Sequence, residues 1–269
     1  MKTLFALILL GTVALGSTVA QQGPEPAEKT PPAVAGGKVA PHLAWDKVEA
    51  EPIKRAIADK KPIVVFFPKE GTDVATYLSG DAYVALKKEA QFLYVPIDAA
   101  RGPESEEPAC PLLCANPWAA YGIKDSEESI IILDWFGNYE AVGMKYCRKP
   151  TATELEKGVA RVRTQATSMQ SKIDKHLADA NASINKADFD QAFNLAMKIL
   201  DLKVVGYTGI GEARLIYRAV CDDVLQEVAE LAEDDSAAAR EKLEALARVY
   251  TTKRAADVAA KIAEALKGR

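Results

Sequence analysis

Two short apolar segments with a helical stretch between them form the clearest pattern in the chain. Ile63–Phe67 has five consecutive large apolar residues, rich in β-branched and aromatic types, which indicates a strand covered on both faces. Residues 92–97 have the same character. Residues 73–89 between them return to helical spacing, with a break at 79–81, through the apolar positions Val74, Tyr77, Leu78, Val84 and Leu86. This order predicts a β-α-β unit around which the rest of the chain is arranged.

The segments before and after this unit predict two more helices and a hairpin. Residues 45–60 carry apolar side chains at roughly helical spacing, and Pro52 indicates that the helix starts near that residue. Asn116 and Pro117 are typical of an N-cap followed by proline at the first helical position. Residues 129–135 and 139–146 predict two strands, which a Gly-Asn turn joins into a hairpin.

The C-terminal part of the chain has helical patterns only. Thr151-Ala-Thr-Glu154 fits a capping box and opens a long helix. Its near-heptad apolar spacing favours a helix packed on a domain over a free coiled coil, through Val159, Val162, Ala166, Met169, Ile173 and Ala180. From residue 187 onward we expect helices over 187–200, 212–231, 236–250 and 253–266. Residues 203–211 contain glycines but follow a helix rather than a strand, so they predict a connector and not a phosphate loop.

The N-terminus has the pattern of a secretory signal. Lys2 precedes an apolar run over residues 4–15, and small residues follow up to Ala20, so we expect a signal peptide at 1–20. The run is short for a membrane span, and the alternative is an uncleaved anchor helix. Residues 21–43 are rich in Pro, Gly, Ala and Glu and predict a disordered linker. The expected protein is exported, periplasmic or extracellular, has no membrane span after cleavage, and resides where disulfides persist.

Composition and charge exclude few classes of protein. The hydrophobic fraction of 49% and the charged fraction of 27% are ordinary for one or two globular domains. The net charge of −4 gives no reason to expect nucleic-acid binding, which needs a basic surface. The two histidines, His42 and His176, are not close in sequence to the cysteines, so no metal site is expected. No cofactor is indicated either.

The order of elements over residues 44–166 resembles the thioredoxin-like fold. The segment Lys61-Pro-Ile-Val-Val-Phe-Phe is similar to the central strand of that family, and Val95-Pro-Ile-Asp98 to its next strand. Asn116-Pro-Trp-Ala-Ala-Tyr-Gly-Ile123 is similar to the helix that leads to the family's Tyr-Gly-Val turn. The resemblance implies an α/β thioredoxin-like sandwich, with a central mixed sheet and flanking helices, over residues 44–168. An all-α helical domain is expected over 169–269.

The chain departs from this family at the residues that carry its chemistry. The family has a Cys-x-x-Cys motif at a helix N-terminus after the central strand, where the thiolate is favoured. The matching positions here read Gly71-Thr72-Asp73-Val74, so Gly71 and Val74 stand at the vacated active-site positions. The family's cis-proline is also missing, because residues 124–129 contain no proline. We therefore expect no catalytic residue of the usual disulfide oxidoreductase type.

The cysteines leave several interpretations open. Residues 99–115 predict a long polar loop that contains Cys110 and Cys114. A structural disulfide between them is favoured over free or otherwise paired thiols, and over a relocated redox pair. A relocated pair requires that the two strands of the β-α-β unit are parallel, so that the loop emerges at the same sheet edge as Gly71. Cys221 is expected in the core, and Cys147 could pair with a loop cysteine.

The helical part adds a second resemblance. Residues 177–200, which contain Ala-Asp-Phe-Asp-Gln-Ala-Phe, are similar to one tetratricopeptide-type (TPR-like) hairpin, although stacked repeats usually need about three copies. Together these observations predict a non-catalytic binding or scaffolding module for an unidentified protein or peptide. The alternatives are a thiol–disulfide oxidoreductase or redox sensor that uses Cys110 and Cys114, and a purely structural envelope protein.

Overall fold

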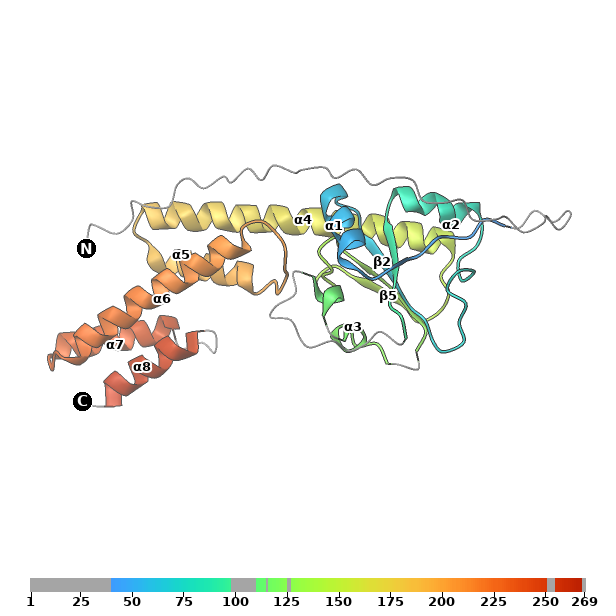
Figure 1. Cartoon of the computed structure of the whole chain (residues 1–269). Coiled ribbons are helices and arrows are strands. Elements are labelled where there is room, and N and C mark those ends of the chain that lie inside the picture. The colour runs from blue at the N-terminus through green and yellow to red at the C-terminus, as the bar shows by residue number, and fades with distance from the viewer. Residues whose placement is uncertain (1–39, 98–109, 115, 125–126, 251–254, 268–269) are drawn as a thin grey trace, which may run out of the picture. The chain divides into compact units, whose positions relative to one another are not determined.

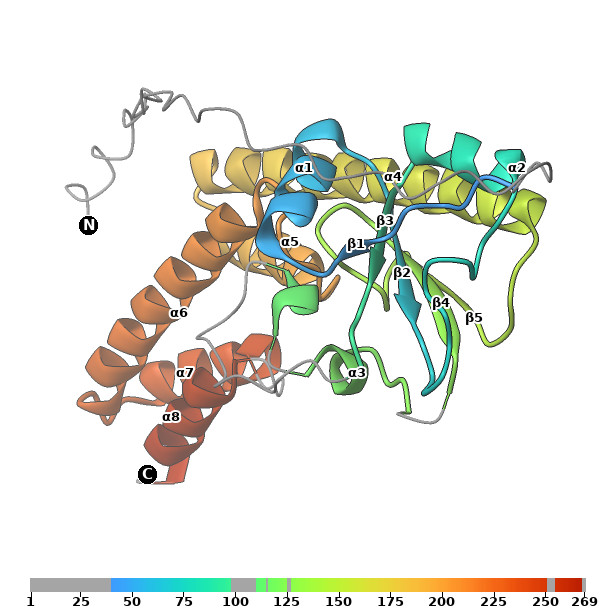
Figure 2. The same cartoon turned by 45° about the vertical axis from the view of Figure 1, so that its right-hand side comes forward.

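A mixed five-stranded sheet forms the first part of the protein (Figure 1). The computed structural model describes residues 40–97, 110–114, 116–124, 127–250 and 255–267. The strands lie in the order β1-β3-β2-β4-β5 (Figure 2) and are β1 (Asp46–Lys47), β2 (Ile63–Phe67), β3 (Gln91–Tyr94), β4 (Ser129–Leu133) and β5 (Met144–Tyr146). β3 is parallel to β1 and β2, whereas β4 is antiparallel to β2 and β5 to β4. The parallel β2–β3 pair confirms the predicted β-α-β unit.

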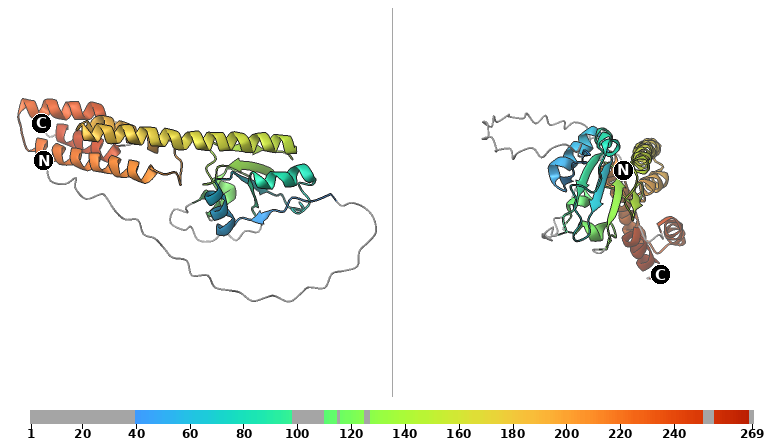
Figure 3. Two further views of the ribbon diagram at one scale, coloured as in Figure 1. Left: turned by 90° about the horizontal axis from the view of Figure 1, so that it is seen from above. Right: turned by 90° about the vertical axis from the view of Figure 1, so that its right-hand side faces the viewer.

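Both faces of the sheet are covered by helices, as the apolar sequence of β2 predicts (Figure 3). Alternating side chains of a strand point to opposite faces. Val65, Phe67 and Ile131 enter a core that we call the α1-side cluster, together with α1 (Ala50–Asp59), η2 (Pro111–Leu113) and α3 (Pro117–Ala120). Val64 and Phe66 enter the α4-side cluster, together with η1 (Leu86–Lys88) and α4 (Ala152–Asn185).

The helical stretch expected over residues 73–89, with its break at 79–81, is confirmed only after that break. The helical residues are α2 (Asp81–Ala85) and η1, whereas residues 73–80 form turns. The Asp73 carboxylate accepts hydrogen bonds from the Ala75 N–H at 3.0 Å and the Thr76 hydroxyl at 2.7 Å. Such side-chain bonds to nearby backbone compete with helix formation. Gly80, at φ +115, then places the chain outside the helical region directly before α2.

The strands also differ from the sequence prediction, because β1 was not expected and β3 and β5 end or begin elsewhere. β1 lies within the segment predicted as helical spacing, and α1 begins after it at Ala50. β3 ends at Tyr94, shortly before Pro96, which has no N–H to donate to a ladder. β5 is confined to its last residues because the Gly143 N–H donates to the Tyr139 carbonyl, which folds the predicted start of that strand into a turn.

Both predicted helix caps are confirmed. The Asn116 side chain accepts from the Ala119 N–H at 3.2 Å, with Pro117 at the first helical position. The Thr151 hydroxyl accepts from the Glu154 N–H at 3.2 Å, and the Glu154 carboxylate accepts from the Thr151 N–H at 2.7 Å. These reciprocal bonds satisfy donors that the first turn of α4 would otherwise leave free.

Helix α4 belongs to two cores. Leu155 and Val159 in its first turns pack in the α4-side cluster. Gly158 permits this approach, because a Cβ at that position would lie 2.5 Å from Ile132 Cδ1. Met169 and Ile173 further along pack in a separate core with the later helices. The domain boundary expected at residue 168 therefore falls inside a continuous helix.

The rest of the described chain is largely helical. It consists of α5 (Phe189–Leu200), α6 (Ile210–Ala232), α7 (Ala237–Tyr250) and α8 (Ala256–Lys267). α5 packs on both α4 and α6, and α7 and α8 pack on α6 around Phe193, Val224, Leu243 and Tyr250. None of the helices in the described part of the chain is both long and apolar enough to span a membrane. The expected signal peptide, most of the expected linker and residues 98–109 of the polar loop lie outside the described residues.

Candidate functional site

The turn after β2 is fastened by a carboxylate that directly precedes β4. The Thr72 hydroxyl donates to one oxygen of Glu128 at 3.0 Å, and the Tyr77 hydroxyl donates to the other at 2.6 Å. We call these three residues the Glu128 clasp. The Tyr77 ring stacks on Phe66 with centroids 4.1 Å apart, and Lys149 Nζ lies 5.4 Å from the Tyr77 centroid. Burial, followed by the Glu128 hydrogen bond, raises the pKa of Tyr77, so the phenol remains a donor.

The two vacated positions differ in their surroundings. Gly71 is exposed at φ +81, and a Cβ there would meet no atom within 4 Å. Val74 is half-buried and packs against the α4-side cluster. Neither position brings a titratable side chain to the turn. In the clasp beside them, the Glu128 carboxylate accepts hydrogen bonds from two hydroxyls. Thr72, Tyr77 and Glu128 therefore close the turn rather than offer a nucleophile.

The cysteine pair lies on the other face of the sheet. Cys110 is 1% exposed in the α1-side cluster, whereas Val74 and Tyr77 belong to the α4-side cluster. Cys110 precedes η2, and half-buried Cys114 ends it. The structure therefore separates the pair from the turn after β2, although the parallel strands that a relocated pair requires are present.

All four cysteines are free thiols in the structure, so the Cys110–Cys114 disulfide stays a prediction. Burial raises the pKa of Cys110 to about 11, which keeps it protonated near neutral pH and lowers its reactivity. Cys221 is buried in α6, as expected, and Cys147 is exposed just after β5.

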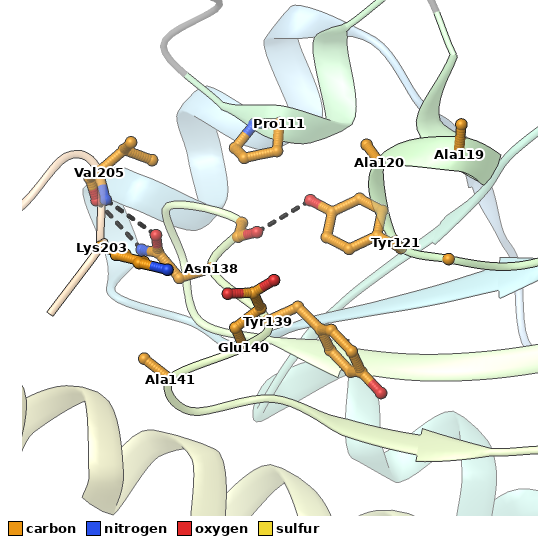
Figure 4. Close-up of a pocket in the computed structure, with 12 residues that line it drawn as sticks. Pro111, Ala119, Ala120, Tyr121, Asn138, Tyr139, Glu140, Ala141, Lys203 and Val205 are labelled. Atoms are coloured by element: carbon orange, nitrogen blue, oxygen red, sulfur yellow. Dashed lines mark hydrogen bonds between the residues drawn. The ribbon is translucent and has the colours of Figure 1, made fainter.

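A cavity of about 470 Å³ is lined in part by Pro111 of η2, the residue that follows Cys110 (Figure 4). Its walls come from η2 and α3, from the β4–β5 connection (residues 134–143) and from the α5–α6 connection (residues 201–209). Its lining includes Pro111, Tyr121, Gly137, Asn138, Tyr139, Glu140, Lys203 and Val205. The α/β part and the helical part both contribute to this pocket.

A buried carboxylate holds the β4–β5 connection. Asp134 has no exposed surface. Its Oδ1 accepts from the N–H groups of Phe136 and Asn138, both at 2.9 Å, and its Oδ2 accepts from Asn138 Nδ2 at 2.8 Å and the Tyr207 hydroxyl at 2.7 Å. Burial raises the pKa of Asp134, while these four donors oppose the rise. Asp134 thus links the sheet to the helical part through Tyr207.

The pocket walls are fixed by further hydrogen bonds, which Figure 4 shows. Asn138 binds the backbone N–H and carbonyl of Val205. The Tyr121 hydroxyl donates to the Gly137 carbonyl at 2.9 Å, which ties α3 to the same connection. Because the walls are preformed, a ligand would not have to order them on binding.

Two opposite charges flank the pocket without neutralising each other. Lys203 and Glu140 are both exposed, and within the described residues neither forms an ion pair. Lys203 has φ +50 at the end of α5, where its N–H donates to the Leu200 carbonyl at 3.2 Å. This is a common C-cap conformation, and it fixes the backbone from which the lysine extends.

One histidine–serine contact in the turn region was not foreseen, and its geometry does not form a nucleophile–base pair. His42 Nδ1 lies 3.0 Å from Ser79 Oγ. The Ser79 hydroxyl already donates to the Thr76 carbonyl at 2.7 Å, so the proton in the contact comes from the histidine. The nearby Asp73 carboxylate is engaged by Ala75 and Thr76 rather than by His42. A catalytic triad requires the reverse arrangement.

Neither a metal site nor a known relative identifies the function of the described structure. Within the described ranges, no group of three or more His, Cys, Asp or Glu could hold a metal ion. No family model, curated protein or solved structure matches the chain. Sequence reasoning missed the pocket and its Asp134–Asn138–Tyr207 network. Its only local signal was the Asp-x-x-x-Asn spacing at the hairpin turn, which is common in turns of many kinds.

Proposed function

We propose that the chain is an exported, non-catalytic binding or scaffolding module, built from a thioredoxin-like domain and a TPR-like helical region. The mixed sheet between two layers of helices is compatible with the thioredoxin-like resemblance of residues 44–168. Helix α5 follows α4 after a short connection and packs on it. This arrangement is compatible with a TPR-like hairpin at residues 177–200. The signal-like N-terminus supports export.

The observation that carries this proposal is the Glu128 clasp. In the thioredoxin-like family, the turn after the central strand presents cysteines, and disulfide exchange there needs a thiolate. In this chain the turn presents no sulfur, and Thr72 and Tyr77 are bonded to Glu128 instead. The position that would carry chemistry in the family serves here to hold the fold.

The pocket is the site at which we place binding of a protein or peptide segment. Its volume lies within the range of ligand sites, and η2, α3 and two connections all contribute to its walls. Tyr139 contributes an aromatic side chain to the lining, and Lys203 and Glu140 contribute one charge of each sign. A peptide segment carries apolar, cationic and anionic groups within a short length, so it can satisfy all three.

The proposal is tested by capture of partners from an envelope extract of the source organism. The bait is the purified protein, and the pocket variant is Lys203→Glu. Lys242→Glu, on an exposed position of α7 outside the pocket, is the matched control. We expect the pocket variant to capture at least about tenfold less of a specific partner, the scale of one charged contact at an interface. Equal capture by all three proteins, or none by the wild type, contradicts the proposal.

A second candidate is a thiol–disulfide oxidoreductase or redox sensor that uses Cys110 and Cys114. The observation in its favour is that one short turn, η2, carries both thiols. Insulin reduction separates the candidates. We expect no turnover by the wild type, and turnover that disappears in Cys110→Ser/Cys114→Ser would favour the enzyme.

A further inference from the structure

We propose that Cys110 and Cys114 are an oxidation site whose disulfide changes the wall of the adjacent pocket. The modifying agent is a small-molecule or protein disulfide of the kind present in an oxidising compartment. The inference rests on the proposed function for the meaning of the pocket, but the structural change can be measured without any ligand.

The Cys110 sulfur packs directly against the pocket wall. A Cβ placed on Gly137 would lie 2.5 Å from Cys110 Sγ, and 3.3 Å from both Pro111 Cδ and the Tyr121 hydroxyl oxygen. Only glycine allows this approach, and its φ of +86 favours glycine as well. Pro111, Tyr121 and Gly137 all line the pocket. The thiol therefore lies immediately behind the surface that a ligand would contact.

The second cysteine is one tight turn away. The Leu113 N–H donates to the Cys110 carbonyl at 2.9 Å, and the Cys114 N–H donates to the Pro111 carbonyl at 3.3 Å. The two sulfurs are not bonded in the structure. A disulfide needs an S–S distance of about 2.05 Å and Cβ atoms about 3.8 Å apart, so at least one side chain must turn to form it. Pro111 lies between the two cysteines and must accommodate that movement.

The chemistry follows ordinary thiol–disulfide exchange. Cys114 is the more exposed thiol, so its thiolate attacks the external disulfide RSSR, forms a mixed disulfide and releases one RS⁻. Cys110 then loses its proton and attacks the Cys114 sulfur, which forms the Cys110–Cys114 bond and releases the second RS⁻. The two cysteines lose two electrons and two protons, and RSSR becomes two RSH. The buried position of Cys110 makes the second step the slower one.

Gly137 connects this turn to the helical part. It lies between Asp134 and Asn138, which bind Tyr207 and Val205 of the α5–α6 connection. A displacement of Gly137 is therefore expected to weaken the bonds that hold Val205 and to move the nearby Lys203. Oxidation at Cys110 and Cys114 would in this way change two walls of the pocket together.

The test combines redox titration with amide hydrogen exchange on the purified protein. Oxidised and reduced glutathione set the redox state, and mass spectrometry with thiol labelling reports the loss of two hydrogen atoms. In the oxidised form we expect amide exchange over residues 136–141 and 203–207 to quicken about fivefold to tenfold, the scale of one lost hydrogen bond. Cys114→Ser leaves the Cys110 contact in place and should abolish both changes. Cys147→Ser, outside the pocket, should retain both.

Two results would overturn the inference. One is that Cys110 and Cys114 stay unlinked under oxidising glutathione, and the other is that they link with unchanged exchange in both segments. Because hydrogen exchange needs no partner, failure of partner capture alone would count against the proposed function only. Conversely, partner capture that is intact and equal in the two redox forms would count against this inference only.

Discussion

The side chain of Asn138 binds both backbone groups of Val205, a residue 67 positions away in the sequence. Asn138 Oδ1 accepts from the Val205 N–H at 2.9 Å, and Asn138 Nδ2 donates to the Val205 carbonyl at 3.1 Å. The same Nδ2 donates to Asp134. A single buried amide therefore joins the hairpin of the sheet to the connection between two helices.

Asn138→Ala should reduce the free energy of unfolding by about 1–3 kcal/mol, because it leaves buried partners on Asp134 and Val205 without hydrogen bonds. Urea unfolding measures the loss. Asn194→Ala, on the exposed side of α5, is the matched control and should change stability little. Equal stability of the two variants would show that the Asn138 bonds do not hold the connection.

The Asp134 carboxyl should make stability depend on pH in a defined direction. Burial raises the folded-state pKa of Asp134 above its ordinary 3.8, so the folded protein binds this proton more tightly than the unfolded chain. The resulting stabilisation is present at pH below the unfolded pKa and is lost as the pH rises through the folded pKa. Asp134→Asn removes this dependence.

We therefore expect the stability advantage of the wild type over Asp134→Asn to be largest near pH 4 and to shrink as the pH rises. Denaturant unfolding of both proteins at several pH values between about 4 and 8 gives the two curves. An advantage that grows with rising pH would mean that the four donors around Asp134 outweigh its burial.

Loss of the Glu128 clasp should loosen the turn after β2. Glu128→Ala removes the acceptor of both Thr72 and Tyr77, which should cost about 1–2 kcal/mol of stability and speed proteolysis over residues 71–77. The neighbouring Glu127→Ala serves as control. Within the part of the chain that the structure describes, the Glu127 side chain forms one ion pair, a partly exposed contact of 3.4 Å with Lys145, and such ion pairs contribute little. Similar effects of the two substitutions would argue against a structural role for the clasp.

Ser129 should tolerate loss of its hydroxyl. It is 1% exposed, and Oγ has no hydrogen-bond partner in the described structure. Burial of an unpaired hydroxyl is unfavourable, so Ser129→Ala should leave stability unchanged or raise it by up to about 1 kcal/mol. Thermal unfolding provides the measurement. A clear drop in melting temperature would reveal that the hydroxyl is bonded in solution.

The elements that depend on local interactions could be predicted from the sequence. The apolar run of β2 predicts a strand buried on both faces, and Asn116 and Thr151 mark the starts of their helices because a cap acts within one turn. Residues 73–80 have helical apolar spacing but are not helical. The Asp73 side chain forms a competing turn there, which the spacing of apolar residues does not reveal. The pocket could not be foreseen, because Asn138 meets Val205, and Asp134 meets Tyr207, only after the helical part has packed.

The path of α4 through two cores has a consequence for how the protein unfolds. Its 34 residues, about 50 Å of uninterrupted helix, share one ladder of backbone hydrogen bonds between the sheet and the helices that follow. Melting either end exposes apolar residues of α4 and frays the helix toward the other end. Denaturation should therefore proceed as one cooperative transition, and a chain shortened at residue 168 should aggregate rather than yield a stable fragment.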